Sequence, residues 1–232
     1  MPKPPPPPIP VWRRGDPVEP VRALLARGGV LAIPTESSYG LGADPWNPIG
    51  IETIYRIKGR ERGKALPVVV AGIEQLPALG IDLGIDPDLN IVKPLFAHWP
   101  GPLTVVLPLV SSTERPLPAA AGERTLAVRV PGHEGLRELL AAIGHGLTAT
   151  SANRSGDEPV LDPAELPGLL AGEDAMIVNG GVLPGGPPST LVAIGEEGLV
   201  VLRAGRFPAE RLKQASAKDP TDRSDRTDPS DQ

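Results

Sequence analysis

Hydroxyl-bearing residues and glycines gather directly after an apolar segment near the amino terminus. The run 29–33 (Gly-Val-Leu-Ala-Ile) predicts a buried strand that Pro34 ends, and the polar segment 35–42 follows it. Open α/β sheets bind ligands at the carboxyl ends of their strands, so this segment is a candidate to hold an anionic, hydroxyl-rich ligand such as a nucleotide. An ordinary turn with capping hydroxyls explains the local sequence slightly better.

Cations are concentrated in a loop between a predicted helix and a predicted strand: Lys58, Arg60, Arg62 and Lys64. Side chains of like charge at this spacing repel one another unless an anion lies among them. A phosphate chain would supply that anion, with arginine making bidentate contacts and lysine acting as a point charge. A solvated surface run, partly offset by Glu61, is an evenly matched interpretation.

Further polar residues stand beside apolar segments later in the chain. Ser151 and Asn153 follow a predicted strand and can bond a ribose, a base edge or a phosphate, although turn chemistry again explains them. Arg129 lies inside an apolar strand and needs a partner if it is buried, either a carboxylate ligand or an internal Asp or Glu. Ser189 and Arg203 have similar positions beside predicted strands.

The sequence shows no standard catalytic arrangement. Ser-His-Asp and paired-carboxylate patterns are not apparent, and Glu36 and Glu52 are potential bases that nothing singles out. The glycine pattern matches neither GxGxxG nor a Walker A loop. With no cysteine and scattered histidines, we expect no metal site made of protein side chains. The implied catalysis is positioning with charge stabilisation, as in nucleotidyl transfer.

Composition limits the class of protein. The 232 residues are 40% hydrophobic but only 3% aromatic, so the core must be built mainly from aliphatic side chains. The formal net charge of -5 argues against a globally basic nucleic-acid surface, although a local basic patch remains compatible with it. No apolar run approaches the length of a membrane span, and no signal peptide is evident. We therefore expect a cytoplasmic protein.

The chain divides into three parts. Residues 1–10 form a proline-rich arm, residues 11–213 a folded domain, and residues 214–232 a polar tail that we expect to be disordered. Within the domain, helices and strands alternate but some strands are adjacent, which favours a mixed α/β sheet. We expect helices over 17–27, 49–56, 91–98, 135–143, 163–170 and 208–213, and strands over 30–33, 66–71, 103–109, 125–130, 147–150, 175–178, 189–194 and 199–203.

Read in order, these segments resemble the YrdC family, the TsaC-type threonylcarbamoyl-AMP synthases. The resemblance covers about Val18 to Phe207, and the chain resembles the short form, without an extra carboxyl-terminal domain. It implies an α/β fold with a twisted mixed sheet, flanking helices and a concave, positively charged cavity. The matching segments are Pro34-Thr35-Glu36, Tyr39-Gly40-Leu41, Lys58-Gly59-Arg60 with Lys64 and Leu66, Trp99-Pro100-Gly101-Pro102-Leu103-Thr104, Val128-Arg129-Val130-Pro131, Thr150-Ser151-Ala152-Asn153, Ser155-Gly156, Ser189-Thr190 and Leu202-Arg203-Ala204-Gly205.

The resemblance also implies an activity and its site. The activity is synthesis of L-threonylcarbamoyladenylate from L-threonine, bicarbonate or CO₂, and ATP, with release of pyrophosphate and use of Mg²⁺, for threonylcarbamoyladenosine modification of tRNA. Thr35 and Arg129, with Ser189 nearby, would hold threonine. The residues that would hold ATP are Lys58, Arg60, Thr125, Ser151, Asn153 and Arg203, of which Lys58 and Arg60 would be catalytic.

The chain departs from the family pattern at four positions, and two other functions are alternatives to the synthase. Glu61, Ala65, Pro67 and Ala193 differ from the usual residues, three of them in the loop after Lys58. A divergent YciO-like paralogue that binds RNA or nucleotide without synthase activity is the main alternative, and an interaction protein that uses the proline-rich arm is a third. The acidic balance predicts weak, salt-sensitive tRNA binding. Threonylcarbamoyl-transferase proteins are potential partners.

Overall fold

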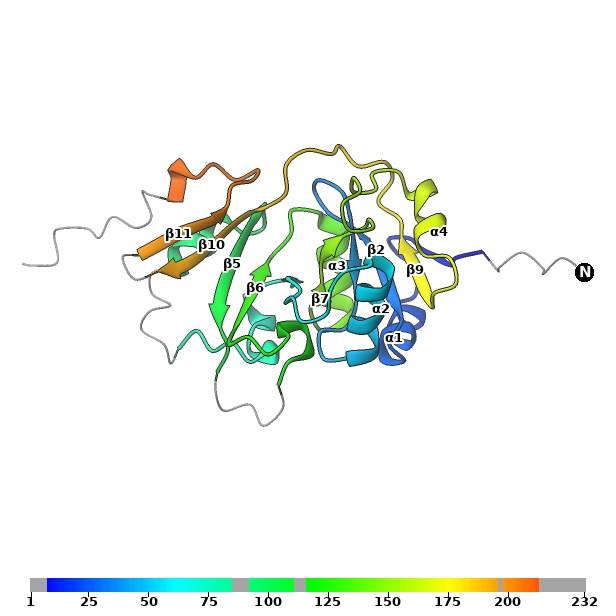
Figure 1. Cartoon of the computed structure of the whole chain (residues 1–232), viewed down its shortest axis with the longest axis horizontal. Helices are drawn as coiled ribbons and strands as arrows, with labels where there is room; N and C mark the ends of the chain where they lie inside the picture. Colours follow the sequence, from blue (N-terminus) through cyan, green and yellow to red (C-terminus); the bar gives the residue numbers. More distant parts are fainter. Residues whose placement is uncertain (1–7, 85–91, 111–115, 196–197, 213–232) are drawn as a thin grey trace, which may run out of the picture.

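The chain forms two mixed β-sheets with helices packed against them, as seen in a computed structural model (Figure 1). The structure describes residues 8–84, 92–110, 116–195 and 198–212. The mixed α/β class expected from the sequence is confirmed, with the strands divided between a five-stranded and a six-stranded sheet. The first sheet has the order β1 (Val11–Trp12), β9 (Ala175–Val178), β2 (Val30–Pro34), β3 (Tyr39–Gly42) and β8 (Thr150–Ser151).

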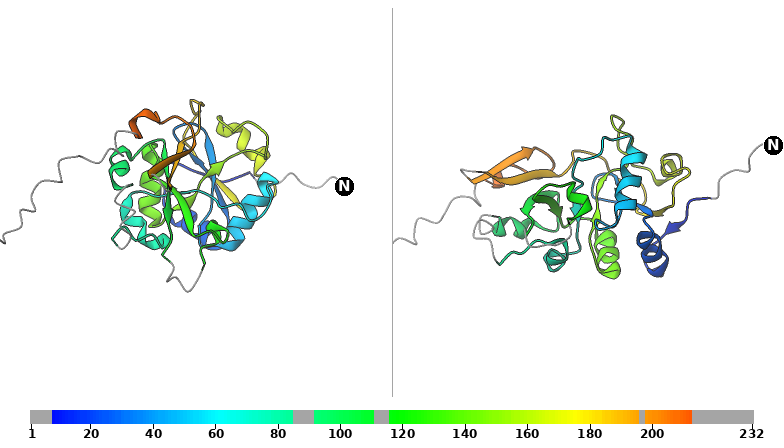
Figure 2. Two further views of the ribbon diagram at one scale, coloured as in Figure 1. Left: turned by 60° about the vertical axis from the view of Figure 1, so that its left-hand side comes forward. Right: turned by 60° about the horizontal axis from the view of Figure 1, so that its bottom comes forward.

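The second sheet takes its strands from both halves of the chain. Its order is β11 (Gly198–Arg203), β10 (Thr190–Gly195), β5 (Leu103–Pro108), β6 (Thr125–Arg129), β4 (Val68–Val69) and β7 (Leu147–Thr148). β10 pairs with β5 and β4 with β6 in parallel, while the other neighbours are antiparallel. Figure 2 shows the β10–β11 hairpin at the edge of the molecule opposite the helices near the amino terminus.

β2 and β3 form a hairpin that the sequence did not predict. Pro34 is the last residue of β2 and pairs with Tyr39, so the chain turns back at once instead of leaving the sheet. β3 contains glycines because it approaches its neighbours closely. A Cβ at Gly40 would lie 3.1 Å from the Thr150 carbonyl oxygen, and one at Gly42 would lie 3.2 Å from the Thr148 carbonyl oxygen.

The two faces of β2 bury into different parts of the core. Leu31 and Ile33 join a cluster with the apolar sides of α1 and α3, whereas Val30 and Ala32 join the larger cluster that extends through the second sheet. Side chains alternate between faces along a strand. A strand buried on both faces has no polar positions, which explains its continuous apolar sequence.

Helices begin and end close to the predicted residues. The α-helices are α1 (Glu19–Ala26), α2 (Pro48–Lys58), α3 (Glu134–Ile143) and α4 (Leu166–Leu169). The helix predicted over 91–98 is present in the described part as a 3-10 helix, Lys93–His98. Residue 91 lies outside the described residues. The predicted helix 163–170 is a 3-10 turn, Pro163–Glu165, followed by α4, and residues 210–212 are helical while residue 213 is not described.

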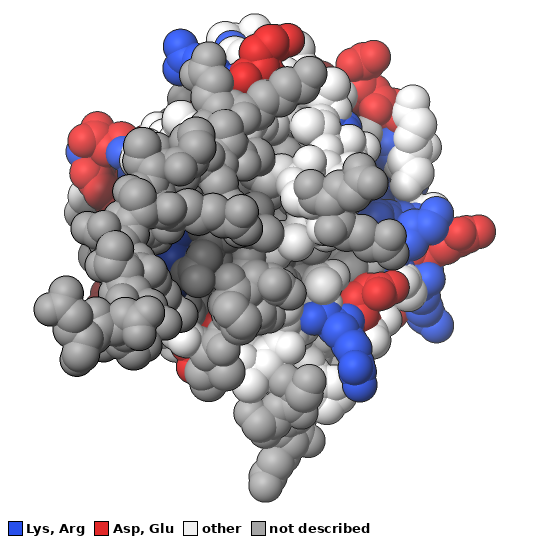
Figure 3. Space-filling view, turned by 90° about the vertical axis from the view of Figure 1, so that its left-hand side faces the viewer, with Lys and Arg blue, Asp and Glu red and all other residues white. Residues whose placement is uncertain are grey.

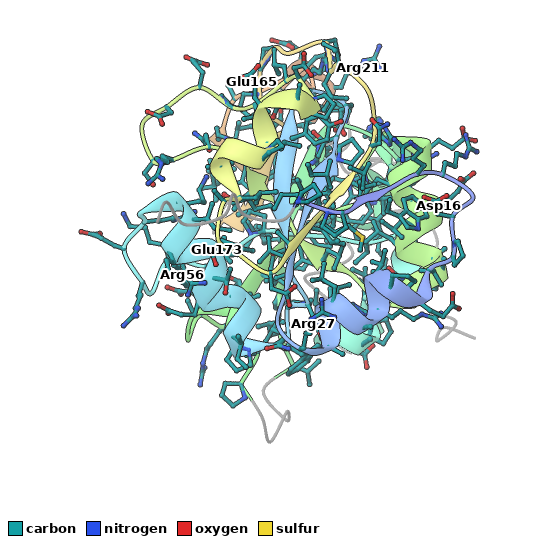
Figure 4. All side chains as sticks on the ribbon, turned by 90° about the vertical axis from the view of Figure 1, so that its right-hand side faces the viewer. Asp16, Arg27, Arg56, Glu165, Glu173 and Arg211 are labelled. Carbon is teal, nitrogen blue, oxygen red and sulfur yellow. The ribbon has the colours of Figure 1, made fainter. Side chains whose placement is uncertain are left out.

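Two caps and two ion pairs fix helix ends. The side chain of Asn47 accepts a hydrogen bond from the Ile49 N–H at the start of α2, and His133 does the same for Leu136 at the start of α3. Arg27 after α1 and Arg56 near the end of α2 pair with Asp174 and Glu173, the residues just before β9 (Figure 4). These partly exposed pairs contribute little stability individually.

The predicted strand 147–150 is divided between the sheets. Leu147–Thr148 forms β7 in the second sheet and Thr150–Ser151 forms β8 in the first, with Ala149 between them. The Ala149 N–H donates to the Pro67 carbonyl oxygen at 2.7 Å. The two sheets therefore meet at this residue, which we call the crossing residue.

Candidate active site

A cavity of about 820 Å³ is lined by residues of both sheets. Its lining comes from the β2–β3 turn, the start of β4, β5, β6, the segment around the crossing residue, and β10 and β11. Most of the residues nominated from the sequence lie in this lining, although they are far apart in the chain. Those in the lining are Thr35, Arg60, Thr125, Arg129, Ser151, Ser189 and Arg203.

Thr35 organises the β2–β3 turn with its own side chain. Its hydroxyl donates to the Ser38 carbonyl oxygen at 2.7 Å and accepts from the Ser37 and Ser38 N–H groups, each at 3.4 Å. The turn interpretation is therefore correct for this hydroxyl. Since Thr35 also lines the cavity, the same geometry fixes the polar groups of the turn beside a ligand.

Arg129 ends β6 and forms an ion pair with Glu36 of the β2–β3 turn. The side chains of Arg129 and Glu36 are 11% and 16% exposed. Burial lowers the pKa of Arg129, and the Glu36 carboxylate opposes that shift. The sequence left open whether the partner of Arg129 is a ligand or an internal acidic residue. The structure shows an internal partner, Glu36, and Arg129 also borders the cavity.

Lys58 holds the loop that contains Ser151 and Asn153. Its ammonium donates to the carbonyl oxygen of Ser151 at 2.6 Å and to the side-chain oxygen of Asn153 at 2.7 Å. The Ser151 hydroxyl donates to that same Asn153 oxygen at 2.6 Å. Burial, with a smaller effect of nearby Arg60, lowers the pKa of Lys58 to about 8. Lys58 and Asn153 are not in the cavity lining, so the structure places them behind Ser151.

Ser189 and Arg203 come together at the β10–β11 side of the cavity. The Arg203 guanidinium donates to the Ser189 carbonyl oxygen at 3.0 and 3.2 Å, and burial lowers its pKa. The Ser189 hydroxyl lies 2.7 Å from that of Thr104, a nearly buried residue of β5 that also lines the cavity. Thr104 was not among the site residues predicted from the sequence, although it ends the Trp99–Thr104 motif.

A second residue missed from the sequence is Arg206. Its guanidinium donates to the Glu36 carbonyl oxygen at 2.5 Å and thus joins the segment after β11 to the β2–β3 turn. The chain is tight here, because a Cβ on Gly205 would lie 2.2 Å from the Pro188 carbonyl oxygen. In the sequence, Arg206 is marked by its position directly after the family motif Leu202–Gly205.

The cationic loop separates into a cavity residue and surface residues. Arg60 lines the cavity, whereas Arg62 pairs with Glu52 and Lys64 with Glu61 on the surface. The solvated interpretation therefore holds for Arg62 and Lys64. The lining also contains Glu123 and Glu158 beside its arginines, and Figure 3 shows both signs of charge on one face. The positively charged cavity stays a prediction.

No cluster of three His, Cys, Asp or Glu side chains suited to a metal ion occurs among the described residues. In the same part of the chain, no helix combines the length and the apolar character needed to cross a bilayer.

Comparison with known proteins shows to which family this chain is related. Residues 23–205 match the Sua5/YciO/YrdC family model, described as telomere recombination. The chain belongs to the Sua5/YciO/YrdC family. The match spans nearly the whole range over which the sequence resembled YrdC proteins, so that resemblance is confirmed.

Three relatives of this chain share one name. Proteins named threonylcarbamoyl-AMP synthase are 38% identical over 138 residues in Idiomarina loihiensis and 37% identical over 164 residues in Alkalilimnicola ehrlichii. These alignments cover 60% and 70% of this chain and 72% and 80% of the relatives. A third, from Thiobacillus denitrificans, is 34% identical over 74% of this chain and 88% of its own length.

Solved structures of the family share the fold. P. abyssi Sua5 complexed with L-threonine has a TM-score of 0.75 and 30% identity, covering 90% of this chain. This chain spans 60% of that Sua5 chain, which is the longer protein. E. coli YciO has a TM-score of 0.71 and 24% identity over 88% of this chain and 98% of its own, which shows the common fold.

Proposed function

We propose that this protein makes L-threonylcarbamoyladenylate from L-threonine, bicarbonate or CO₂, and ATP, with release of pyrophosphate. The observation that carries the proposal is Arg129, a nearly buried guanidinium at the edge of a cavity that could hold an amino acid beside a nucleotide. Relatives named threonylcarbamoyl-AMP synthase and the threonine complex of P. abyssi Sua5 support it.

Threonine binds at the Arg129 side of the cavity in this proposal. The guanidinium takes the α-carboxylate, because arginine matches a carboxylate with parallel N–H donors. Thr35 and Ser189 lie in the same lining and supply polar contacts to the amino acid. The link between Ser189 and Thr104 holds one of these hydroxyls in place.

ATP occupies the remainder of the cavity. Arg60 and Arg203 contact the phosphates, and Thr125 and Ser151 contact the nucleotide. Lys58 and Asn153 fix the Ser151 loop through the hydrogen bonds described above. A direct contact between Lys58 and a phosphate stays a prediction, because it requires the ammonium to exchange one of these acceptors for the ligand.

The proposed chemistry has two bond-forming steps. The ammonium of bound threonine gives up a proton to solvent, and the neutral amine then attacks the carbon of CO₂ and loses a second proton, which gives a carbamate. A carbamate oxygen then attacks the α-phosphorus of ATP, the bond to the bridging oxygen breaks, and pyrophosphate leaves. Arg60 and Arg203 stabilise the negative charge on the transferred group and on pyrophosphate. Mg²⁺ enters as part of the substrate, bound to the phosphates of ATP.

The product would feed a later modification of tRNA. It is an activated acyl adenylate, so an acyl-transferring partner protein must consume it. We expect direct tRNA contact to be weak and to decline steeply with salt, because the chain carries a net charge of -5. The cytoplasmic location expected from the sequence stays a prediction.

Pyrophosphate release from ATP and bicarbonate, with and without L-threonine, tests the proposal. Release that depends on threonine and is far weaker with L-serine is the expected result. The competing function is a YciO-like nucleotide-binding module, for which the similarity to E. coli YciO supports the fold alone. ATP binding by the folded protein without any pyrophosphate release would favour that module.

A further inference from the structure

Glu36 and Arg129 form an unusual pair within this molecule. Among the ion pairs of the described residues, it is the one in which both side chains are less than a fifth exposed. It also joins the two sheets, because Glu36 belongs to the β2–β3 turn and Arg129 ends β6. A buried pair adds little net stability, so its presence beside a cavity calls for a functional explanation.

The two partners are placed differently with respect to the cavity. Arg129 lines the cavity and Glu36 does not. One N–H of Arg129 donates to Glu36 Oε1, and the other guanidinium donors have no partner among the residues that the structure describes. Glu36 Oε2 is buried and also has no hydrogen-bond partner in this part of the chain. Arg129 therefore has donors left for a ligand, while Glu36 acts from behind it as a fixed negative charge.

Glu36 cancels the charge of Arg129, and Arg203 in the same lining is the cation that remains nearby. A ligand with a lone carboxylate would bring a second negative charge close to that of Glu36, which is unfavourable in a site of low dielectric constant. A ligand with a carboxylate and an adjacent ammonium would add no net charge. At an effective dielectric constant of about 20, a charge about 7 Å from Glu36 changes a binding constant by tens of fold.

We infer that Glu36 makes this subsite selective for the zwitterionic form of an amino acid over simple carboxylates. The inference rests on the proposed function only in taking threonine as the amino acid. Glu36 is a positioning and specificity residue here, because its oxygens do not reach the cavity. It would also keep small anions such as bicarbonate, a substrate of the proposed reaction, from occupying Arg129 in place of threonine.

Calorimetric titration with two ligands tests the inference. L-Threonine has the carboxylate and the ammonium, and 3-hydroxybutyrate has the same carbon skeleton and carboxylate without the ammonium. We expect the wild-type protein to prefer threonine strongly, and Glu36→Gln to reduce the ratio of the two affinities at least about tenfold. Glu36→Asp keeps the charge and should preserve most of the ratio. Glu52→Gln, at an exposed glutamate outside the cavity lining, should leave it unchanged.

Equal ratios in the wild-type protein and folded Glu36→Gln would overturn the inference, since a merely structural role would weaken both ligands alike. If Glu36→Gln does not fold, the wild-type protein still decides, because equal affinity for threonine and 3-hydroxybutyrate is incompatible with the inference. A wild-type protein that binds another amino acid in place of threonine refutes the proposed function alone, and the ratio is then measured with that amino acid and its des-amino analogue. Binding of no amino acid refutes both.

Discussion

Arg129 and Lys58 are both buried cations near one cavity, yet their surroundings differ. Arg129 is paired with a carboxylate, whereas the acceptors around Lys58 are neutral carbonyl, amide and hydroxyl oxygens. Guanidinium keeps its proton at any physiological pH. The Lys58 ammonium, desolvated and without a carboxylate partner among the described residues, has its pKa lowered to about 8. One charge of the site is therefore constant, and the other titrates close to neutral pH.

Of the substitutions considered, loss of the Arg129 side chain should reduce threonine-dependent activity the most. We expect Arg129→Ala to reduce threonine-dependent pyrophosphate release at least about 100-fold while ATP binding persists, because truncation of one partner of a buried charge pair costs about 2–5 kcal/mol. The variant also leaves Glu36 buried without a counterion, so urea unfolding should show a free energy of unfolding lower by about 3 kcal/mol.

The double variant Arg129→Ala/Glu36→Gln is the control for this effect. It removes the orphaned charge and should recover part of the stability but none of the threonine-dependent activity. Unchanged turnover in Arg129→Ala would refute the role of the guanidinium in binding threonine.

Lys58 should give the site a dependence on pH. Above pH 8 its ammonium loses a proton and hence a donor, so we expect kcat/KM to decline with an apparent pKa near 8. The free energy of unfolding should change with pH in the opposite direction to kcat/KM. Because the folded pKa lies below the unfolded value, the folded state binds fewer protons between about pH 8 and 10.5, and Lys58 contributes stability that rises through this window.

Lys58→Arg separates these effects from other titrations. Guanidinium stays protonated, so any activity that the variant retains should lose the decline near pH 8. Lys64→Arg, at an exposed surface residue, is the matched control and should keep the wild-type profile. The same alkaline decline in Lys58→Arg and in the wild-type protein would show that another group titrates.

Gly205→Ala should have a smaller effect, on the backbone beside Ser189 at the β10–β11 side of the cavity. Its Cβ would meet the Pro188 carbonyl oxygen at 2.2 Å and the Ser189 carbonyl oxygen at 2.6 Å, so the backbone must shift. We expect a loss of about 1–3 kcal/mol in the free energy of unfolding and a raised KM for threonine. Gly168→Ala is the control, because it has open space in α4 and should be neutral or stabilising. Equal melting temperatures for the two variants would contradict this.

Arg62→Ala should have the smallest effect. Its side chain is 78% exposed and pairs with Glu52 on the surface. We expect the free energy of unfolding to change by less than about 0.5 kcal/mol and the KM for ATP to remain within a factor of two or so. A tenfold rise in that KM would place Arg62 in the nucleotide site and extend the cationic lining beyond Arg60.

The sequence was sufficient to predict the helices and strands whose structure depends mainly on residues close to them in the chain. Helical periodicity located α1 and α3, and the apolar run of β2 identified a strand buried on both faces. The hairpin formed by β2 and β3 was missed because glycines and hydroxyls hide a strand whose pairing with distant residues decides its structure. For the same reason, one predicted strand at 147–150 was not recognised as part of two sheets.

In the site, too, local features could be predicted and contacts between distant residues could not. The resemblance to the family nominated residues that mostly share one cavity lining. Periodicity alone could not have chosen Glu36 as the partner of Arg129, because the two are 93 positions apart and other carboxylates were available. Nor could it have shown that Lys58 lies behind Ser151, since that depends on how α2 meets β8.

The crossing residue Ala149 has a mechanical consequence. Within the described part of the chain, it is the shortest covalent connection between the two sheets, and hydrogen bonds on both sides restrain it: Thr148 N–H to the Ala43 carbonyl oxygen at 2.9 Å, and Ala149 N–H to the Pro67 carbonyl oxygen at 2.7 Å. The sheets therefore cannot slide apart at this point. A ligand that enters the cavity beside Ser151 therefore meets a stretch of backbone that both sheets hold in place.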